Sequence, residues 1–239
     1  MLPTKPEQIL FLDIETVPQY PDYGSVPENW RSLWDKKAGL IRRREEDTPE
    51  TLYERAGIYA EFGRIICVSV GYITQGEFPE VRIKSFAGSD EKTLLREFAG
   101  IFEKSGRFSF LCAHNGKEFD FPYLCRRMLV NGVPIPGILN MAGKKPWEVT
   151  HFDTMELWKF GDYKSFVSLD LLSAIFGIPT PKDDIDGSEV CGVYYRDNDL
   201  QRIVTYCEKD VLTLMKVFYK LHGETLPDGV KTLFLGNNA

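Results

Sequence analysis

The chain has 239 residues, enough for one substantial domain or two small ones, and its hydrophobic content of 43% and charged content of 27% are those of an ordinary globular protein. A net charge of −6 argues against a protein that coats nucleic acid through bulk electrostatic attraction. No apolar stretch approaches the ~20 residues that cross a bilayer, no basic-then-apolar leader opens the chain, and the five cysteines are scattered without a Cys-x-x-Cys pair. We therefore expect a cytoplasmic protein with no membrane partner and no disulfide framework.

The first predicted element is a buried strand at residues 8–14, which form a short apolar run. Residues 17–62 follow; they are rich in proline and charge and are too long for an ordinary connection, so we interpret them as a surface insertion. Within the insertion, residues 27–38 and 49–61 are predicted helices, the second with Thr48 as its cap.

The rest of the chain alternates between strand and helix patterns. The predicted strands after the insertion are 64–73 and 80–86, which form a hairpin, then 108–112 and a short one at 149–152. The predicted helices are 89–104 with Ser89 as its cap, 119–130, 168–176 and 199–221, and residues 181–195 are predicted to be a polar loop. This order predicts an α/β fold with a mixed central sheet flanked by helices. We expect one domain at 1–223 and a C-terminal tail at 224–239.

The candidate chemistry lies in acidic residues of three separate segments. Asp13 and Glu15 are two apart on the first strand, so their side chains leave the same face of it. Asp120 opens the helix after the 108–112 strand, and Asp210 lies on the last long helix. If the fold gathers these four carboxylates, they need a countercharge, and divalent cations held by oxygen ligands supply one that is suited to cutting phosphodiesters.

Each acid also has a simpler interpretation when it is taken alone. Asp13 and Glu15 are solvent-exposed if the strand ends before them, Asp120 is a favourable charge at a helix N-terminus, and Asp210 is a surface acid. Tyr206, one helical turn before Asp210, would then pack in the core. In the functional interpretation Tyr206 orients a water molecule through its hydroxyl, because a phenol with a pKa near ~10 is a poor base at neutral pH.

In order and spacing, the three segments resemble the motifs of the DEDD superfamily of 3'–5' exonucleases, over about residues 8–221. Asp13-Ile14-Glu15-Thr16 is similar to the first motif. The stretch 115–120 (NGKEFD) is similar to the second, in the form seen in proofreading domains of B-family DNA polymerases. The stretch 206–210 (YCEKD) is similar to the third in its tyrosine form, since the histidine form would need His where Thr205 stands.

A further stretch at 184–190 (DIDGSEV) is similar to stand-alone bacterial proteins of the same exonuclease group. The resemblance implies a ribonuclease H-like fold and a metal-dependent 3'–5' exonuclease that releases 5'-mononucleotides from a single-stranded 3' end, with DNA favoured over RNA. It implies two divalent ions, Mg²⁺ or Mn²⁺, one held by Asp13, Glu15 and Asp210 and the other by Asp13 and Asp120. Tyr206 would position water. Candidate substrate contacts are Thr16, His114, Asn115, Gly116 and Phe119.

Several residues keep two interpretations. Trp30 and Trp34 with Arg42, Arg43 and Arg44 could stack bases and grip phosphates, but core packing of the tryptophans and solvation of the arginines is the simpler interpretation. His114 either contacts substrate or makes a structural hydrogen bond. For His151, Asp153 and Cys207 we expect structural roles: a strand end, a cap for 154–159, and core packing.

Two other functions fit the same motifs. One is an RNA-processing exonuclease, which a contact to the 2'-hydroxyl would distinguish. The other is a catalytically idle nucleic-acid-binding module on the same fold. The four acids and Tyr206 argue against the module, because a binding protein gains nothing from an uncompensated acidic pocket.

Overall fold

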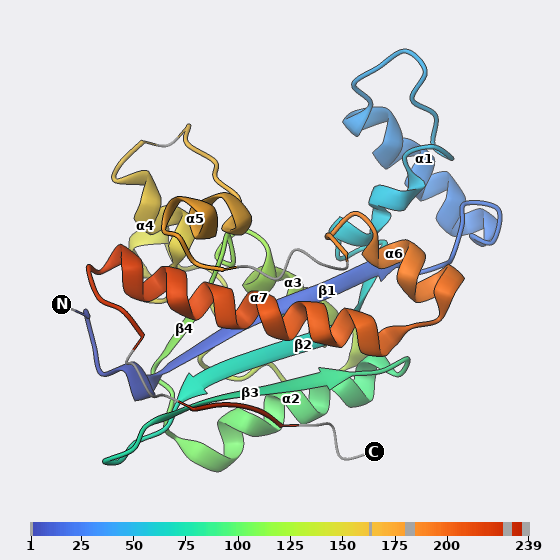
Figure 1. Ribbon diagram of the computed structural model, residues 1–239. Coiled ribbons are helices and arrows are strands. Elements are labelled where there is room, and N and C mark those ends of the chain that lie inside the picture. The colour runs from blue at the N-terminus through green and yellow to red at the C-terminus, as the bar shows by residue number, and fades with distance from the viewer. Residues whose placement is uncertain (1, 163, 180–184, 227–230, 236–239) are drawn as a thin grey trace.

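The computed structural model describes residues 2–162, 164–179, 185–226 and 231–235 and is built around one six-stranded sheet (Figure 1). The strands, in chain order, are β1 (Ile9–Pro18), β2 (Gly63–Ile73), β3 (Glu80–Ala87), β4 (Phe110–Ala113), β5 (Phe152–Asp153) and β6 (Lys231–Leu235). Their order across the sheet is β5-β4-β1-β2-β3-β6. β1, β2 and β3 are antiparallel neighbours, whereas β4 is parallel to β1, β5 to β4 and β6 to β3. The predicted mixed sheet is confirmed, and the order and directions of β1 to β5 are those of the ribonuclease H-like fold, with β6 added at the edge beside β3.

Helices cover both faces of the sheet. They are α1 (Glu28–Ile41), α2 (Glu91–Ser105), α3 (Asp120–Asn131), α4 (Thr154–Lys159), α5 (Leu169–Ile175), α6 (Val190–Gly192) and α7 (Leu200–Leu221), with short 3-10 turns η1 (Pro6–Gln8), η2 (Tyr53–Ile58) and η3 (Pro146–Glu148) and a π-turn η4 (Val193–Asp197). In Figure 1, α7 crosses the front of the sheet and α2 lies behind it. No helix in the described part of the chain has the length and apolar content needed to cross a membrane.

β1 shows how the sequence assigns its residues to the two layers. Ile9 and Phe11 pack in one apolar cluster with residues of α7, whereas Leu10 and Leu12 pack in another with residues of α2 and α3. This alternation follows from the two-residue period of a strand. α7 lies very close to the sheet, because a Cβ atom added at Gly71 of β2 would stand 2.6 Å from Val211 Cγ1. Asp13, the next odd residue, therefore belongs to the α7 face.

The insertion at 17–62 is a long excursion between two paired strand ends. Pro18 of β1 pairs with Gly63 of β2, and the amide of Gln19 donates to the carbonyl of Phe62 at 2.8 Å. Between these ends the segment builds its own small apolar cluster around Trp34, whose side chain is fully buried. The insertion therefore has a core of its own, fixed to the body at its base.

The insertion differs from its prediction in one helix. The helix expected at 49–61 is only the 3-10 turn η2. Gly57 lies within it, and a Cβ atom there would stand 3.0 Å from the carbonyl carbon of Val17. Glycine is a poor helix former, and this close packing against β1 fixes the turn where a regular helix was expected.

Other differences are local. β1 runs on to Pro18, so Asp13 and Glu15 lie within the strand and not at its end. Asp90, and not Ser89, caps α2, because its carboxylate accepts the amides of Lys92 and Thr93. Part of the expected 181–195 loop is helical at Val190–Gly192 and in η4, where Val190 and Val193 bury against the first turns of α7. Residues 231–235, within the expected tail, form β6. Of the 184–190 stretch, Asp184 lies outside the described residues.

Candidate metal and catalytic site

The first two acids lie on β1 and face α7. Ligand atoms of Asp13, Glu15 and Cys207 all lie within 4.8 Å of one another. Glu15 is buried and Asp13 is partly exposed. Burial raises the pKa of the Asp13 carboxyl well above its usual range, and the charges of Asp120 and Asp210 raise it further. Burial likewise raises the pKa of Glu15, with Asp13 as the largest acidic contributor.

The sheet opens beside these two acids. β4 pairs with β1 only from Ile9 to Phe11, so the edge of β1 beyond Phe11 is left to other partners. On the opposite edge, the register between β1 and β2 shifts between Glu15 and Thr16. Such a bulge re-aims neighbouring side chains and is a common feature next to active sites. The space left by β4 is where α3 begins.

Asp120 is the first residue of α3 and is only 3% exposed. Burial raises the pKa of its carboxyl from the ordinary 3.8 to about 7, while its own amide and the amide of Ile14 act in the opposite direction. Asp120 therefore reaches the open edge of β1. This is how the fold brings the second segment to the first.

Asp210 and Tyr206 come from α7, one turn apart on one face of the helix. Burial raises the pKa of the Asp210 carboxyl to about 6, against the lowering effect of the Tyr206 hydroxyl beside it. The pKa of Tyr206 is raised by burial and by the charges of Asp210, Glu15 and Asp13. The four acids and Tyr206 thus interact electrostatically, although they come from three distant parts of the chain.

The donor set fits hard divalent cations. Four carboxylates share one partly buried region, and among the described residues none of them forms an ion pair with a lysine or arginine. Oxygen-rich sites of this kind suit Mg²⁺ or Mn²⁺. A cation would also offset the cost of burying the ionised acids, which is the main cause of their raised pKa values, and the repulsion of Asp13 by Asp120 and Asp210.

We expect the stability of the metal-free protein to fall as pH rises from about 4 to about 7. Asp120 and Asp210 have pKa values of about 7 and about 6 in the folded protein, both raised from 3.8. The raised carboxyls bind more protons in the folded protein than in the unfolded chain, so the free energy of unfolding decreases as pH rises. The lowered pKa values of His114 and His151 act in the opposite direction, but these two groups are outnumbered by the carboxyls. Thermal unfolding in a chelator, measured from pH 4 to 8, tests this.

Asp120→Asn is the matched variant for this measurement. It removes one titrating group, so its unfolding temperature should depend less on pH than that of the wild type. Added Mg²⁺ or Mn²⁺ should raise the unfolding temperature of the wild type more at pH 8 than at pH 5, since the ion binds the ionised carboxylates. A metal-free stability that rises from pH 4 to 7 in the wild type would contradict the expectation.

Cys207 has a role that the sequence analysis did not anticipate. It is fully buried, as expected of a core residue, but its Sγ also lies 3.3 Å from Asp13 Oδ2 and 3.6 Å from the Asp13 carbonyl oxygen. The thiol can donate to the carboxylate and so help to fix its orientation. The available signal was its place on α7, three residues before Asp210 and hence on the same side of the helix.

The turn at residues 114–117, before α3, is fixed by a residue that lies far from it in the sequence. The Asp153 carboxylate accepts the amides of Asn115 and Lys117 at 3.0 and 3.1 Å, and it also caps α4 through the amides of Met155 and Glu156. The predicted role of Asp153 as the cap of α4 is confirmed, whereas its hydrogen bonds to the turn were not predicted. Asp153 thereby sets the position of the turn that leads into Asp120.

His114 is held by two hydrogen bonds. Its Nδ1 lies 2.9 Å from Thr154 Oγ1 and its Nε2 lies 2.8 Å from the carbonyl oxygen of Val167, and burial lowers the pKa of the ring. Both nitrogens are therefore occupied, which favours the structural interpretation over a substrate contact. His151 is also bound at both ring nitrogens, by Leu111 N at 3.2 Å and Ile138 O at 2.8 Å.

The remaining candidate substrate contacts surround the same turn. Asn115 has a left-handed backbone with φ of 61°, and its carbonyl accepts the amides of Glu118 and Phe119. Gly116 is buried, and a Cβ atom there would stand 2.3 Å from Ala113 Cβ, so packing alone requires glycine. Phe119 and Thr16 are each partly exposed near the site. Substrate contacts by Thr16, Asn115, Gly116 and Phe119 stay predictions.

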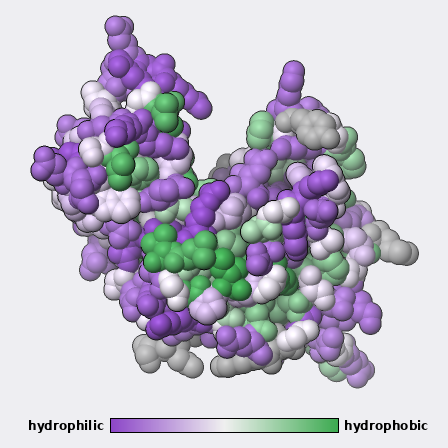
Figure 2. All heavy atoms as spheres, turned by 180° about the vertical axis from the view of Figure 1, so that it is seen from behind, coloured by the Kyte–Doolittle hydropathy of each residue, from purple (hydrophilic) through white to green (hydrophobic). Residues whose placement is uncertain are grey.

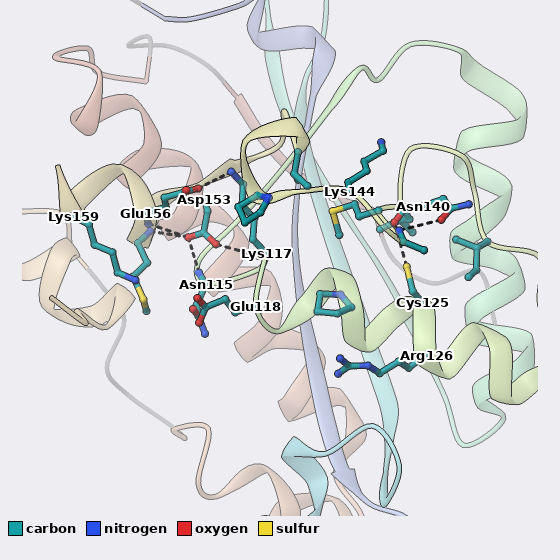
Figure 3. Close-up of a pocket in the computed structure, with 18 of the residues that line it drawn as sticks. Asn115, Lys117, Glu118, Cys125, Arg126, Asn140, Lys144, Asp153, Glu156 and Lys159 are labelled. Carbon is teal, nitrogen blue, oxygen red and sulfur yellow. Dashed lines mark hydrogen bonds and ion pairs between the residues drawn. The ribbon is translucent and has the colours of Figure 1, made fainter. Parts of the chain in front are cut away.

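A pocket of about 970 Å³ adjoins this turn (Figure 3). Asn115, Lys117 and Glu118 line one side of it, and Arg126, Lys144 and Lys159 add positive charge. Lys117 is paired with Glu156 at 2.6 Å. The pocket adjoins the turn but does not include the four carboxylates.

Two projections rise from the body of the molecule. They are the insertion and the α4–α5 region (Figure 1), and from behind the surface is hollowed between them (Figure 2). The tryptophans of the insertion differ: Trp34 is core, as expected, whereas Trp30 is 41% exposed. Arg42, Arg43 and Arg44 are exposed at the C-terminal end of α1.

Three comparisons show which known proteins this chain is similar to. A family model described as a predicted 3'–5' exonuclease related to the exonuclease domain of PolB matches residues 58–225. A DNA polymerase of Thermococcus hydrothermalis is 26% identical over 196 residues, which is 74% of this chain and only 11% of that polymerase. The structure of the family B DNA polymerase from the archaeon Pyrobaculum calidifontis aligns with 88% of this chain and 24% of its own, with 15% identity and a TM-score of 0.48.

Proposed function

Because the chain belongs to the family of predicted 3'–5' exonucleases related to the exonuclease domain of PolB, we propose that it removes mononucleotides from the 3' end of single-stranded nucleic acid, with DNA as the favoured substrate. The relative from Thermococcus hydrothermalis is a DNA polymerase, and this supports DNA over RNA. The observation that carries the proposal is the gathering of four carboxylates with raised pKa values around one strand.

In the proposed reaction the acids hold two divalent cations, Mg²⁺ or Mn²⁺. When bound, such cations neutralise charge on the reacting phosphate and lower the pKa of coordinated water. Asp13 and Glu15 would contribute from β1, Asp120 from α3 and Asp210 from α7. The Cys207 thiol, 3.3 Å from Asp13 Oδ2, would keep that carboxylate in one orientation.

Tyr206 would orient the attacking water through its hydroxyl. Its raised pKa keeps the hydroxyl protonated at neutral pH, so it serves as a hydrogen-bond donor or acceptor and not as a base. The water oxygen would bond to phosphorus, and the 3'-oxygen of the penultimate nucleotide would leave, take up a proton and become the new 3'-hydroxyl of the shortened strand. The terminal nucleotide would depart with a 5'-phosphate.

The deciding experiment is digestion of a 5'-end-labelled single-stranded DNA in Mg²⁺, in Mn²⁺ and in a chelator. We expect a ladder that shortens from the 3' end, with 5'-mononucleotides as product and no cutting in the chelator. An RNA of the same sequence and a paired duplex, run in parallel, determine the preferred substrate. Digestion from the 5' end, or none with either metal, would rule the proposal out.

A further inference from the structure

A second pocket, of about 550 Å³, lies where the insertion meets the body; we call it the junction pocket. Tyr20, Trp30 and Phe62 line it from the insertion, Arg64 from β2, Lys92 from α2 and Val130 from α3. The matched family region begins at residue 58, so Tyr20 and Trp30 lie outside it. The junction pocket is therefore partly built from residues that the family match does not cover.

The insertion presents an aromatic wall to this pocket. Trp30 is 41% exposed and meets the ring of Phe62 edge to face, with centroids 6.2 Å apart and an interplanar angle of 84°. Trp34, one turn further along α1, fills the core of the insertion and is fully buried. The fold of the insertion thus depends on Trp34, while much of the Trp30 ring remains open to a ligand.

Arg64 adds a cationic side chain to the same pocket. One of its terminal nitrogens donates to the carbonyl of Ser89, whereas its Nε is buried and has no hydrogen-bond partner among the described residues. The Arg64 side chain therefore contributes positive charge and its flat guanidinium to the wall of the pocket, while its Nε is covered by the protein itself.

The charges around the pocket select the part of a nucleotide that fits. Glu61 and Asp90 line it together with Arg64 and Lys92, and the deeper Glu91 is paired with Arg127 at 2.6 Å. The acidic side chains beside Arg64 and Lys92 disfavour a phosphate within the pocket, but they can accept hydrogen bonds from the amino groups of a nucleobase. An aromatic wall with mixed donors and acceptors is suited to a stacked base.

The junction pocket also lies within reach of the carboxylates. Gln19, which lines it, is four residues beyond Glu15 along the same chain, a span of roughly 13 Å in extended conformation. Resting on the function proposed above, we infer that the junction pocket binds one base of the substrate strand, a few nucleotides from the end being cut. The base stacks on Trp30, and the cationic Arg64 side chain lies against it in the wall of the pocket.

The test is strand binding in a chelator, where no cutting occurs. Fluorescently labelled single strands carry one abasic site at each of the first several positions from the 3' end, and affinity is measured by anisotropy. For the wild type we expect one position at which loss of the base weakens binding about tenfold. Trp30→Ala should weaken binding of the intact strand by a similar factor and should be insensitive to the abasic site at that position.

Matched variants exclude loss of folding and general effects. Trp30→Phe should restore most of the affinity, and Trp147→Ala, which removes another exposed tryptophan outside the junction pocket, should leave both affinity and the abasic profile unchanged. Arg64→Gln should weaken binding of the intact strand, and its affinity should be insensitive to the same abasic position as that of Trp30→Ala. The inference is overturned if Trp30→Ala binds like the wild type, or if the wild type shows no position dependence.

A hydrolysis assay separates this inference from the proposed function. In Mn²⁺, Trp30→Ala should cut a dinucleotide, which is too short to reach the junction pocket, at the wild-type rate, and should cut a long strand with a raised KM. Equal effects on both lengths overturn the inference and leave the exonuclease proposal intact. If the wild type cuts neither, the exonuclease proposal fails, and the abasic profile alone decides whether the pocket takes a base.

Discussion

Asp13→Asn is expected to lower metal-dependent kcat/KM by about a thousandfold while making the metal-free protein more stable. The proposed role of Asp13 in holding both cations explains the loss, since preorganised electrostatic groups contribute factors of this size. The gain in stability has two sources: burial raises the pKa of the Asp13 carboxyl, and the charges of Asp120 and Asp210 repel its ionised form. A neutral amide at this position removes both costs. Activity on end-labelled strands and thermal unfolding in a chelator measure the two effects.

The two opposite effects distinguish loss of the site from loss of the fold. Mn²⁺ should raise the unfolding temperature of the wild type, whereas it should have little effect on that of Asp13→Asn. Asp35→Asn, an exposed aspartate on α1, is the matched control and should behave as the wild type does. Activity of Asp13→Asn near the wild-type level would remove Asp13 from the proposed mechanism.

Arg127→Met is expected to destabilise the protein by about 3–5 kcal/mol. Arg127 and Glu91 are 5% and 6% exposed, and the guanidinium donates to both carboxylate oxygens of Glu91, at 2.9 and 2.6 Å. Its third nitrogen donates to the carbonyl of Ala60 in the insertion. Removing the arginine leaves a buried carboxylate without its cation, which is the costly way to break such a pair.

Chemical denaturation of a small variant set measures this cost. Arg126→Met changes the neighbouring exposed arginine and should stay within about 0.5 kcal/mol of the wild type. Adding Glu91→Gln to Arg127→Met should recover part of the loss, because the unpaired charge disappears while the amide of Ile65 keeps an acceptor in the glutamine oxygen. A cost below about 1 kcal/mol for Arg127→Met would show that the pair is not needed for stability.

Strand periodicity was sufficient to predict that Asp13 and Glu15 share a face, since that depends only on a two-residue repeat. Helix spacing likewise related Tyr206 to Asp210. The motif order predicted the fold class and the family, because a resemblance spread over three segments is specific even where each one alone is weak. The metal-holding roles of the four acids remain predictions that the proposed variants test.

Long-range contacts could not be predicted from the local pattern. The hydrogen bond from the amide of Asn115 to the Asp153 carboxylate joins residues 38 positions apart, and no spacing rule predicts it. The contact between Cys207 and Asp13 spans 194 positions. The prediction of a helix at 49–61 was wrong for the same reason. The packing of Gly57 against Val17, in the 3-10 turn η2, overrides the local helix preference.

The closure of the insertion at its base has a consequence for how the protein can be altered. Since Pro18 and Gly63 face each other across two antiparallel strands, the whole insertion is, in topology, an enlarged loop at the tip of a β-hairpin. Its apolar cluster around Trp34 is internal, whereas Gly57 and Ala60 near its end accept hydrogen bonds from Tyr123 and Arg127 of the body. The part of the insertion before Gly57 could therefore be exchanged for the equivalent loop of another enzyme, provided that these two contacts are kept. Strand preference could then be re-engineered by transplanting one loop, without changing any of the acidic residues.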